Sequence, residues 1–132
     1  MAFLLDTNIA IHARDGTESV LAKLVEHDGT VLLSALSLAE LQRGLYKNPI
    51  HTALRQLRLE ALLRSIPVLP FDADAAIAYG TIIAECGWVK GRDFYRMIAA
   101  HAIATESILV TNNDGDFRDI RGLAIENWAV EP

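Results

Sequence analysis

The sequence predicts an α/β fold in which a parallel sheet is covered by helices on both faces. Residues 2–5 and 107–110 are short, highly apolar runs, as expected for strands buried on both faces of a parallel sheet. Segments with helical periodicity alternate with such runs, and no linker or low-complexity stretch interrupts them. Right-handed crossovers between parallel strands place helices on both faces. The 132 residues are long enough for one core, so residues 1–132 are predicted to form a single domain.

The individual elements follow from apolar patterns and from turn residues that bound them. Strands are expected at residues 1–5, 30–33, 67–69, 107–110 and 124–126. Helices are expected to start near Asn8, after Gly16, at Ser37, at Ile50, after Asp72 and near Phe94. Gly29, Asn48-Pro49 and Gly87 are typical of the points where helices end.

The expected helix over residues 50–66 is apolar around much of its circumference. Leu54 and Leu57 belong to one stripe, and Leu59 and Leu62 widen it. Such breadth implies burial on more than one side. Self-association or an amphipathic partner helix would cover the excess, and a thicker core within one chain is the alternative.

The composition excludes several classes of protein. Apolar residues make up 52 % and charged residues 22 %, which is typical of a compact globular protein rather than a disordered one. Neither a bilayer-spanning stretch nor a signal peptide is present, so a cytoplasmic protein without a membrane association is expected. Cys86 is the single cysteine, and a buried, inert thiol is expected. The net charge of −5 argues against a general nucleic-acid coat but not against a nucleic-acid enzyme.

Polar residues follow the ends of several expected strands, where ligands bind in open α/β sheets. Asp6 follows the first strand, Ser34 the second, and the loop over residues 111–116 the fourth, while Glu40 lies one turn into a helix. Carboxylates converging there would repel one another unless a cation neutralised them, and Mg²⁺ or Mn²⁺ suits such oxygen ligands. The chemistry served would be metal-assisted phosphodiester hydrolysis.

Each acidic residue also has a purely structural interpretation. Asp6 is a good N-cap for the helix that follows it. Ser37 and Glu40 have the spacing of a capping box, in which the glutamate returns to the backbone of the serine. Asp116 could be a surface turn residue beside an anchoring Phe117.

Four motifs together resemble those of PIN-domain ribonucleases of the VapC toxin type. They are Leu4–Asn8, Ser34–Leu41, Ile98–Ala102 and Leu109–Asn113, followed by Asp116-Phe117, and the match runs over essentially the whole chain. The resemblance implies an α/β/α sandwich on a parallel sheet and a Mg²⁺-dependent endoribonuclease. It also implies a VapB-like antitoxin that occupies the active site, a homodimer and larger toxin–antitoxin complexes.

The family's acidic positions map onto this chain with one exception. The first, second and fourth acids correspond to Asp6, Glu40 and Asp116, which the resemblance makes metal ligands. Further polar positions are expected to orient these carboxylates or the attacking water, namely Asn8, Ser34, Thr111 and Asn112.

The third acid is replaced by Tyr95. A phenol is neutral near pH 7 and is a poor ligand for a hard metal, so metal binding and catalysis are expected to be impaired. Asp93 is not expected to substitute, because positions 93 and 95 point to opposite sides of a helix and Asp93 suits its N-cap. The tyrosine is either a natural loss of activity or a variant selected because a host tolerates it.

Two functional alternatives remain open at this point. A catalytically silent PIN module would bind its partner without cleaving RNA. A haloacid-dehalogenase-like phosphatase also has an aspartate after its first strand, but it needs a second one where this chain has Asn8.

Arg92 and Arg96 are candidate RNA contacts or ordinary solvated residues. His101 is expected to be packed and hydrogen-bonded rather than catalytic.

Overall fold

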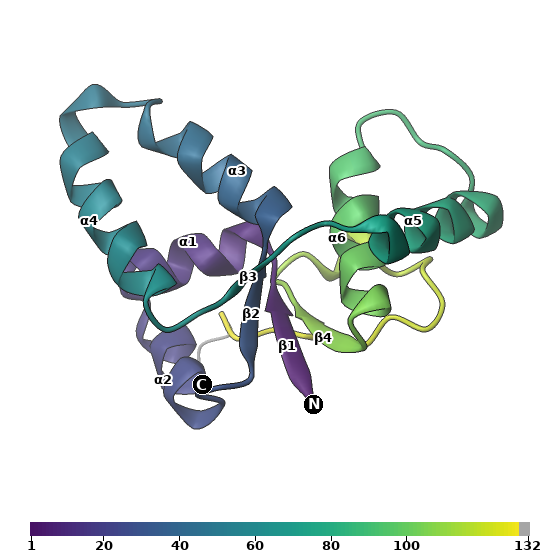
Figure 1. The fold of residues 1–132 in the computed structure, drawn as a ribbon, viewed down its shortest axis with the longest axis horizontal. Coiled ribbons are helices and arrows are strands. Elements are labelled where there is room, and N and C mark those ends of the chain that lie inside the picture. Colours follow the sequence, from purple (N-terminus) through teal and green to yellow (C-terminus); the bar gives the residue numbers. More distant parts are fainter. Residues whose placement is uncertain (130–132) are drawn as a thin grey trace.

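A five-stranded parallel sheet forms the centre of the molecule in the computed structural model, which describes residues 1–129 (Figure 1). The strand order is β3-β2-β1-β4-β5. The strands are β1 (Ala2–Leu5), β2 (Val31–Ser34), β3 (Val68–Leu69), β4 (Ser107–Val110) and β5 (Ile125–Glu126). The central strand β1 pairs with β2 and β4, and the predicted strand at 107–110 is confirmed residue for residue.

Helices cover both faces of this sheet. They are α1 (Thr7–Asp15), α2 (Glu18–Glu26), α3 (Ala35–Leu45), α4 (Thr52–Leu63), α5 (Ala73–Cys86) and α6 (Asp93–Ala104), with short 3-10 turns at Pro49–His51 and Asp114–Asp116. Figure 1 shows α1 to α4 on one side of the strands and α5 and α6 on the other. The α/β/α sandwich is therefore confirmed.

The alternation of side chains along β1 explains the two layers. Phe3 and Leu5 belong to the core cluster formed with α1 to α4, whereas Leu4 belongs to the cluster formed with α5 and α6. Successive side chains of a strand point to opposite faces, so a strand between two helical layers must be apolar throughout. Leu4 and Leu5 are both 0 % exposed.

Two of the expected N-caps are correct, and two are wrong. Asp6 accepts a hydrogen bond from the Ile9 amide (2.9 Å) at the start of α1, and Asp72 caps α5. The capping box at Ser37 is wrong, because β2 runs directly into α3 and Ser34 caps it by accepting from the Leu36 amide (3.1 Å). Asp93 is the first residue of α6 rather than its cap.

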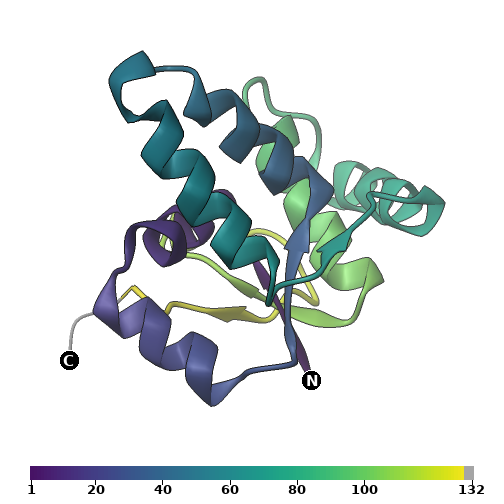
Figure 2. The ribbon, with the colours of Figure 1, turned by 60° about the vertical axis from the view of Figure 1, so that its left-hand side comes forward.

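The side chains of α4 are less buried than the sequence predicts. Only Leu59 and Leu62 of this helix are buried, while Leu54 is 49 % and Leu57 65 % exposed. The reason is the position of the helix, which packs on α1 and α3 at the edge of the molecule (Figure 2). The prediction that this helix is buried on several sides within one chain is therefore wrong.

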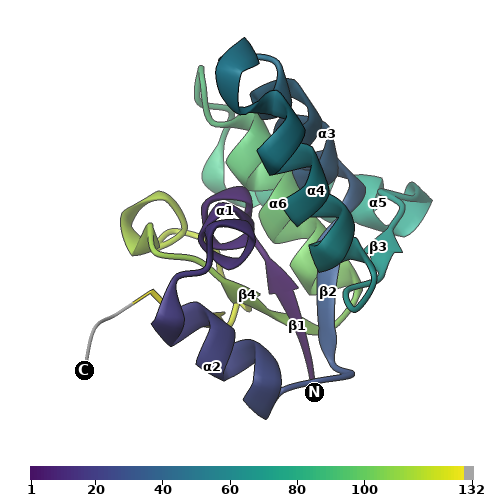
Figure 3. The same cartoon turned by 90° about the vertical axis from the view of Figure 1, so that its left-hand side faces the viewer.

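The hairpin of α3 and α4 extends beyond the carboxyl end of β1 (Figure 3). This arrangement places side chains of both helices beside the end of the strand that Asp6 follows.

Within residues 1–129, no helix is both long and apolar enough to span a bilayer. Cys86 is partly buried rather than fully buried, and its thiol donates to the Asp119 carbonyl (3.3 Å).

Candidate active site

A cavity of about 400 Å³ lies at the carboxyl end of β1. Residues of α1, α3 and α4 line one side of it, and α6 and Phe117 line the other. Its acidic residues are Asp6, Asp15 and Glu40. The cavity thus occupies the sheet edge at which the sequence predicted a site.

Asp6 is held rigidly in the floor of this cavity. Its side chain is buried, at 5 % exposure, and one carboxylate oxygen accepts the Ile9 amide. Burial raises the pKa of Asp6, hydrogen bonds from Thr111 and Ile9 lower it, and the charge of Glu40 raises it further. The net effect is a raised pKa. Asp6 thus caps α1 and also lines the cavity, and its role as a metal ligand stays a prediction.

Glu40 lines the same cavity from α3. Its carboxylate accepts a hydrogen bond from Arg43 (3.3 Å), one turn further along the helix. The hydroxyl of Thr7 donates to Ser37 Oγ (3.2 Å), which joins the first turn of α1 to α3 and so fixes Glu40 relative to Asp6. The structure therefore brings these two predicted carboxylates together.

Asp116 does not line the cavity. It ends the 3-10 turn after β4, where its carboxylate accepts from the side-chain amide of Asn113. The next residue, Phe117, is the one that reaches the cavity wall. Across residues 1–129, no three Asp, Glu, His or Cys side chains are grouped closely enough to hold a metal ion. A ligand role for Asp116 stays a prediction.

Tyr95 lies in the cavity wall on α6, between Phe94 and Ile98. The motif at Ile98–Ala102 lies within α6, and Ile98 is buried. Asp93 does not line the cavity and instead accepts hydrogen bonds from Tyr79 Oη (2.5 Å) and Trp88 Nε1 (3.0 Å). The position at which the resemblance predicts a third acid is thus filled by an aromatic ring.

The four predicted polar positions have different surroundings. Thr111 is fully buried and hydrogen-bonds Asp6, in agreement with an orienting role. Asn8 lines the cavity, whereas Asn112 is exposed and does not. Ser34 also lies outside the cavity wall, because its hydroxyl caps α3 and contacts His101.

His101 is packed and hydrogen-bonded, as predicted. Its Nδ1 lies 2.8 Å from Ser34 Oγ, and its ring meets Phe71 edge-on. Burial lowers the pKa of His101, while the charge of Asp72 and a hydrogen bond to the Pro70 carbonyl partly raise it. A neutral histidine therefore links α6 to the start of α3.

The expectation of an RNA contact at Arg96 is wrong. Its side chain is 1 % exposed and pairs through two hydrogen bonds with Asp119, at 3.0 and 2.9 Å. The buried guanidinium faces the loop after β4 instead of solvent. Arg92 is half-buried and lies outside the cavity wall, so its RNA contact stays a prediction.

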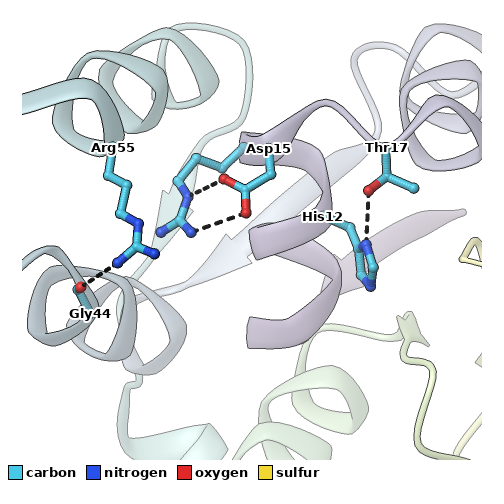
Figure 4. Close-up of polar contacts among 6 residues, drawn as sticks. His12, Asp15, Thr17, Gly44 and Arg55 are labelled. Carbon is cyan, nitrogen blue, oxygen red and sulfur yellow. Dashed lines mark hydrogen bonds and ion pairs between the residues drawn. The ribbon is translucent and has the colours of Figure 1, made fainter. Parts of the chain in front are cut away.

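Four cationic residues in the cavity wall were not anticipated as site residues. They are Arg14, Arg43, Lys47 and Arg55. Figure 4 shows Arg55 donating to the Gly44 carbonyl and His12 bonded to Thr17 on the other side of α1. Arg14 Nε donates to the Asp15 carboxylate (3.0 Å). No local motif marks these cations. Arg14 lies on α1 itself, and only the folding of the α3–α4 hairpin brings the other three to Asp6.

A parallel sheet in this order, with carboxylates at the end of its central strand, defines the class of α/β domains to which PIN domains belong. The model of the PIN domain family matches residues 3–123. The chain therefore belongs to the PIN domain family.

Relatives of known name place the chain within the VapC group of that family. Ribonuclease VapC2 of Rickettsia felis is 34 % identical over 97 % of this chain and 98 % of that protein. The tRNA(fMet)-specific endonuclease VapC of Shigella flexneri is 36 % identical over 98 % of this chain and 99 % of that protein.

Solved structures agree with this placement. A structure of VapBC2 from Rickettsia felis, bound to a DNA fragment from its promoter, contains a chain of TM-score 0.86 and 31 % identity. The match covers 97 % of this chain and 99 % of that one. A DNA-bound VapBC from Salmonella typhimurium also gives a TM-score of 0.86, at 30 % identity and with 97 % and 98 % of the two chains covered.

Proposed function

We propose that this VapC-type PIN ribonuclease acts as the toxin of a type II toxin–antitoxin module and hydrolyses RNA phosphodiester bonds with Mg²⁺ or Mn²⁺. The observation that carries the proposal is the convergence of Asp6 and Glu40 in one cavity at the carboxyl end of β1. The family and the relatives named as ribonucleases support an RNA substrate. A cytoplasmic location is part of the proposal.

The donor set fits a hard divalent cation. Asp6 is buried near a second carboxylate, and both burial and the charge of Glu40 raise its pKa. A cation between the two carboxylates would offset both the burial of the Asp6 charge and its repulsion from Glu40. Mg²⁺ is commonly held by one or two carboxylates together with water. Asp6 and Glu40 would hold it, with Asp116 as the proposed third ligand. When bound, the metal supplies an activated water and stabilises charge on the phosphate.

The residues of the chain have separate roles in this proposal. The Ile9 amide and Thr111 hold the Asp6 carboxylate in one orientation. The Thr7–Ser37 bond keeps Glu40 on the same side of the cavity. Arg43 can leave Glu40 at little cost, because their ion pair is solvent-accessible, at 68 % and 28 % side-chain exposure.

We further propose that Tyr95 impairs the reaction. Its ring packs on Phe117 in the wall where the family has a carboxylate, so one ligand is missing and the space beside Asp6 is more apolar. The chain with Tyr95 is expected to bind metal weakly and to cleave RNA slowly. A silent, antitoxin-binding PIN module is the second candidate, and Tyr95 is the observation that favours it.

One experiment separates the active and silent proposals. The chain and its Tyr95→Asp variant are incubated with structured RNAs under a Mn²⁺ or Mg²⁺ titration, with EDTA as the negative control. The initiator tRNA is the first substrate to test, since the Shigella flexneri relative is named for it. Metal-dependent cleavage by the variant supports the nuclease. Absence of cleavage by both proteins contradicts it and supports the silent module.

The phosphatase alternative loses its basis, because the chain belongs to the PIN family. A VapB-like antitoxin and a homodimer remain the proposed partners. The exposed apolar side chains of α4 and its approach, among them Ile50 at 86 % and Leu57 at 65 % exposure, support a partner that covers them. The solved VapBC structures of the relatives support the same proposal.

A further inference from the structure

We propose that Lys47 and Arg55 form a phosphate-binding subsite in the α3–α4 wall of the cavity, where they bind an RNA backbone phosphate next to the one that is cleaved. The inference rests on the proposed ribonuclease function. It assigns the substrate contacts to the α3–α4 hairpin, whereas Arg96 is committed to Asp119.

Of the four cationic residues in the cavity wall, two pair with carboxylates. Arg14 bonds Asp15 at 3.0 and 3.3 Å, and Arg43 bonds Glu40 at 3.3 Å. These two cations are therefore neutralised by carboxylates of the same wall. Among the described residues, neither Lys47 nor Arg55 has a carboxylate within ion-pair distance.

Arg55 has unused hydrogen-bonding capacity that faces the cavity. The residue is half-buried, and among the described residues its guanidinium makes one hydrogen bond, a long one from Nη1 to the Gly44 carbonyl (3.4 Å), shown in Figure 4. A guanidinium carries five N–H donors, so most of them are available to a ligand. The Gly44 contact holds the side chain across the gap between α4 and α3.

Lys47 lies just after α3, on the same wall. It is exposed, and it contributes a second positive charge on a flexible stem. A phosphodiester is a single negative charge with oxygen acceptors, which suits a guanidinium fork supported by an ammonium group. An RNA strand with one phosphate at Asp6 and Glu40 would present a neighbouring phosphate to this pair.

A purely structural role for Arg55 makes a different prediction. Cations near the carboxyl end of a helix stabilise its last carbonyls, and Gly44 lies in the last turn of α3. If capping α3 were the whole role of Arg55, its removal would lower stability and leave RNA affinity unchanged.

The test measures RNA binding without cleavage. A fluorescent single-stranded RNA is titrated in EDTA with the chain, Lys47→Gln, Arg55→Gln and the double variant, at several salt concentrations. Arg64→Gln is the matched control, because Arg64 is an exposed arginine at the far end of α4 that does not line the cavity. Thermal melts of every variant report any loss of folding.

Loss of one phosphate contact should reduce the slope of log K against log salt by about 0.7 for a single strand. We expect Lys47→Gln and Arg55→Gln each to weaken binding about three- to tenfold and to reduce the slope, while Arg64→Gln changes neither. In an RNA with one neutral methylphosphonate at the contacted position, the effect of Arg55→Gln should disappear.

The outcomes distinguish this inference from the proposed function. An unchanged affinity and slope for Arg55→Gln, or an equal effect of Arg64→Gln, overturns the subsite even if Tyr95→Asp cleaves RNA. Failure of Tyr95→Asp to cleave any RNA with Mg²⁺ or Mn²⁺ contradicts the nuclease proposal independently of the binding data. Absence of RNA binding by the chain itself overturns the subsite.

Discussion

The ring of Tyr95 meets the ring of Phe117 edge-on, at 90° and with 5.9 Å between the ring centroids. The contact joins α6 to the loop after β4 in the wall of the cavity that holds Asp6. An aromatic pair of this geometry contributes about 0.5–1.5 kcal/mol beyond the area it buries. Tyr95 thus stands where a metal ligand was predicted and adds a packing contact.

Replacing Tyr95 by aspartate should therefore exchange stability for activity. We expect Tyr95→Asp to gain metal-dependent RNA cleavage by about a thousandfold, equivalent to several kcal/mol of transition-state stabilisation. Its free energy of unfolding in EDTA should fall by about 1 kcal/mol, as measured by urea denaturation. Tyr95→Phe keeps the ring and should change neither property. Equal cleavage rates for the chain and Tyr95→Asp would contradict the impairment.

Substitution of Asp6 by asparagine should stabilise the metal-free protein while it removes any nuclease activity. The pKa of Asp6 is raised in the folded state, so ionisation of this group opposes folding as pH rises from its ordinary value of 3.8 through the raised one. Asparagine also caps helices well. We expect Asp6→Asn to melt at a higher temperature than the chain at pH 7 in EDTA.

The pH dependence supplies the check on this prediction. The advantage of Asp6→Asn should disappear below about pH 3.8, where the carboxyl is protonated in both states. Asp28→Asn, at an exposed turn, controls for the loss of one negative charge. A variant that melts below the chain at pH 7 would show that the buried charge does not oppose folding.

Removal of the Asp119 carboxylate should destabilise the fold through Arg96. The change would leave a guanidinium of 1 % exposure without its ion pair, and Asp119→Asn should cost about 2 kcal/mol, less than a fully buried pair because Asp119 is 48 % exposed. The hydrogen bond from Arg96 lowers the pKa of Asp119, so this contribution is present above the ordinary pKa of 3.8 and is lost as pH falls through the lowered one. Urea denaturation at pH 7 and in acid measures it, and an unchanged stability at pH 7 would contradict it.

Charge on the exposed face of α4 should disrupt partner binding without unfolding the chain. Leu57→Glu is expected to change the free energy of unfolding by less than about 0.5 kcal/mol, because Leu57 is 65 % exposed. Copurification with the proposed VapB-like antitoxin, or the proposed homodimer measured by light scattering, should be lost. Gln56→Glu, exposed on the same helix, is the matched control. Retention of both assemblies by Leu57→Glu would place the interface elsewhere.

Local chemistry was sufficient to predict the strands and the position of Asp6. The runs at 2–5 and 107–110 could be buried only as central strands, and an aspartate after the first of them had to lie at the sheet edge. The start of α3 was mispredicted because Ser34 and Ser37 are both competent caps. The length of β2 decides between them, and it is determined by pairing with β1 through Leu33 and with β3 at Ser34.

The wall of the cavity could not be predicted in the same way. Lys47 and Arg55 are separated from Asp6 by a whole strand and at least one helix, and only the packing of the α3–α4 hairpin brings them to it. The exposure of Leu57 likewise depends on α4 having neighbours on one side only. Asp116 was assigned from the resemblance, and the turn after β4 presents its neighbour Phe117 to the cavity, so the ligand role of Asp116 stays a prediction.

The contact between Ser34 and His101 (2.8 Å) connects the helix that carries Glu40 to the helix that carries Tyr95. Both groups are buried, and Ser34 also ends β2, so neither helix can swing outward without breaking a bond at its base. This bond therefore opposes widening of the cavity between α3 and α6. The proposed RNA substrate would then meet a cavity whose width this bond limits before the strand binds.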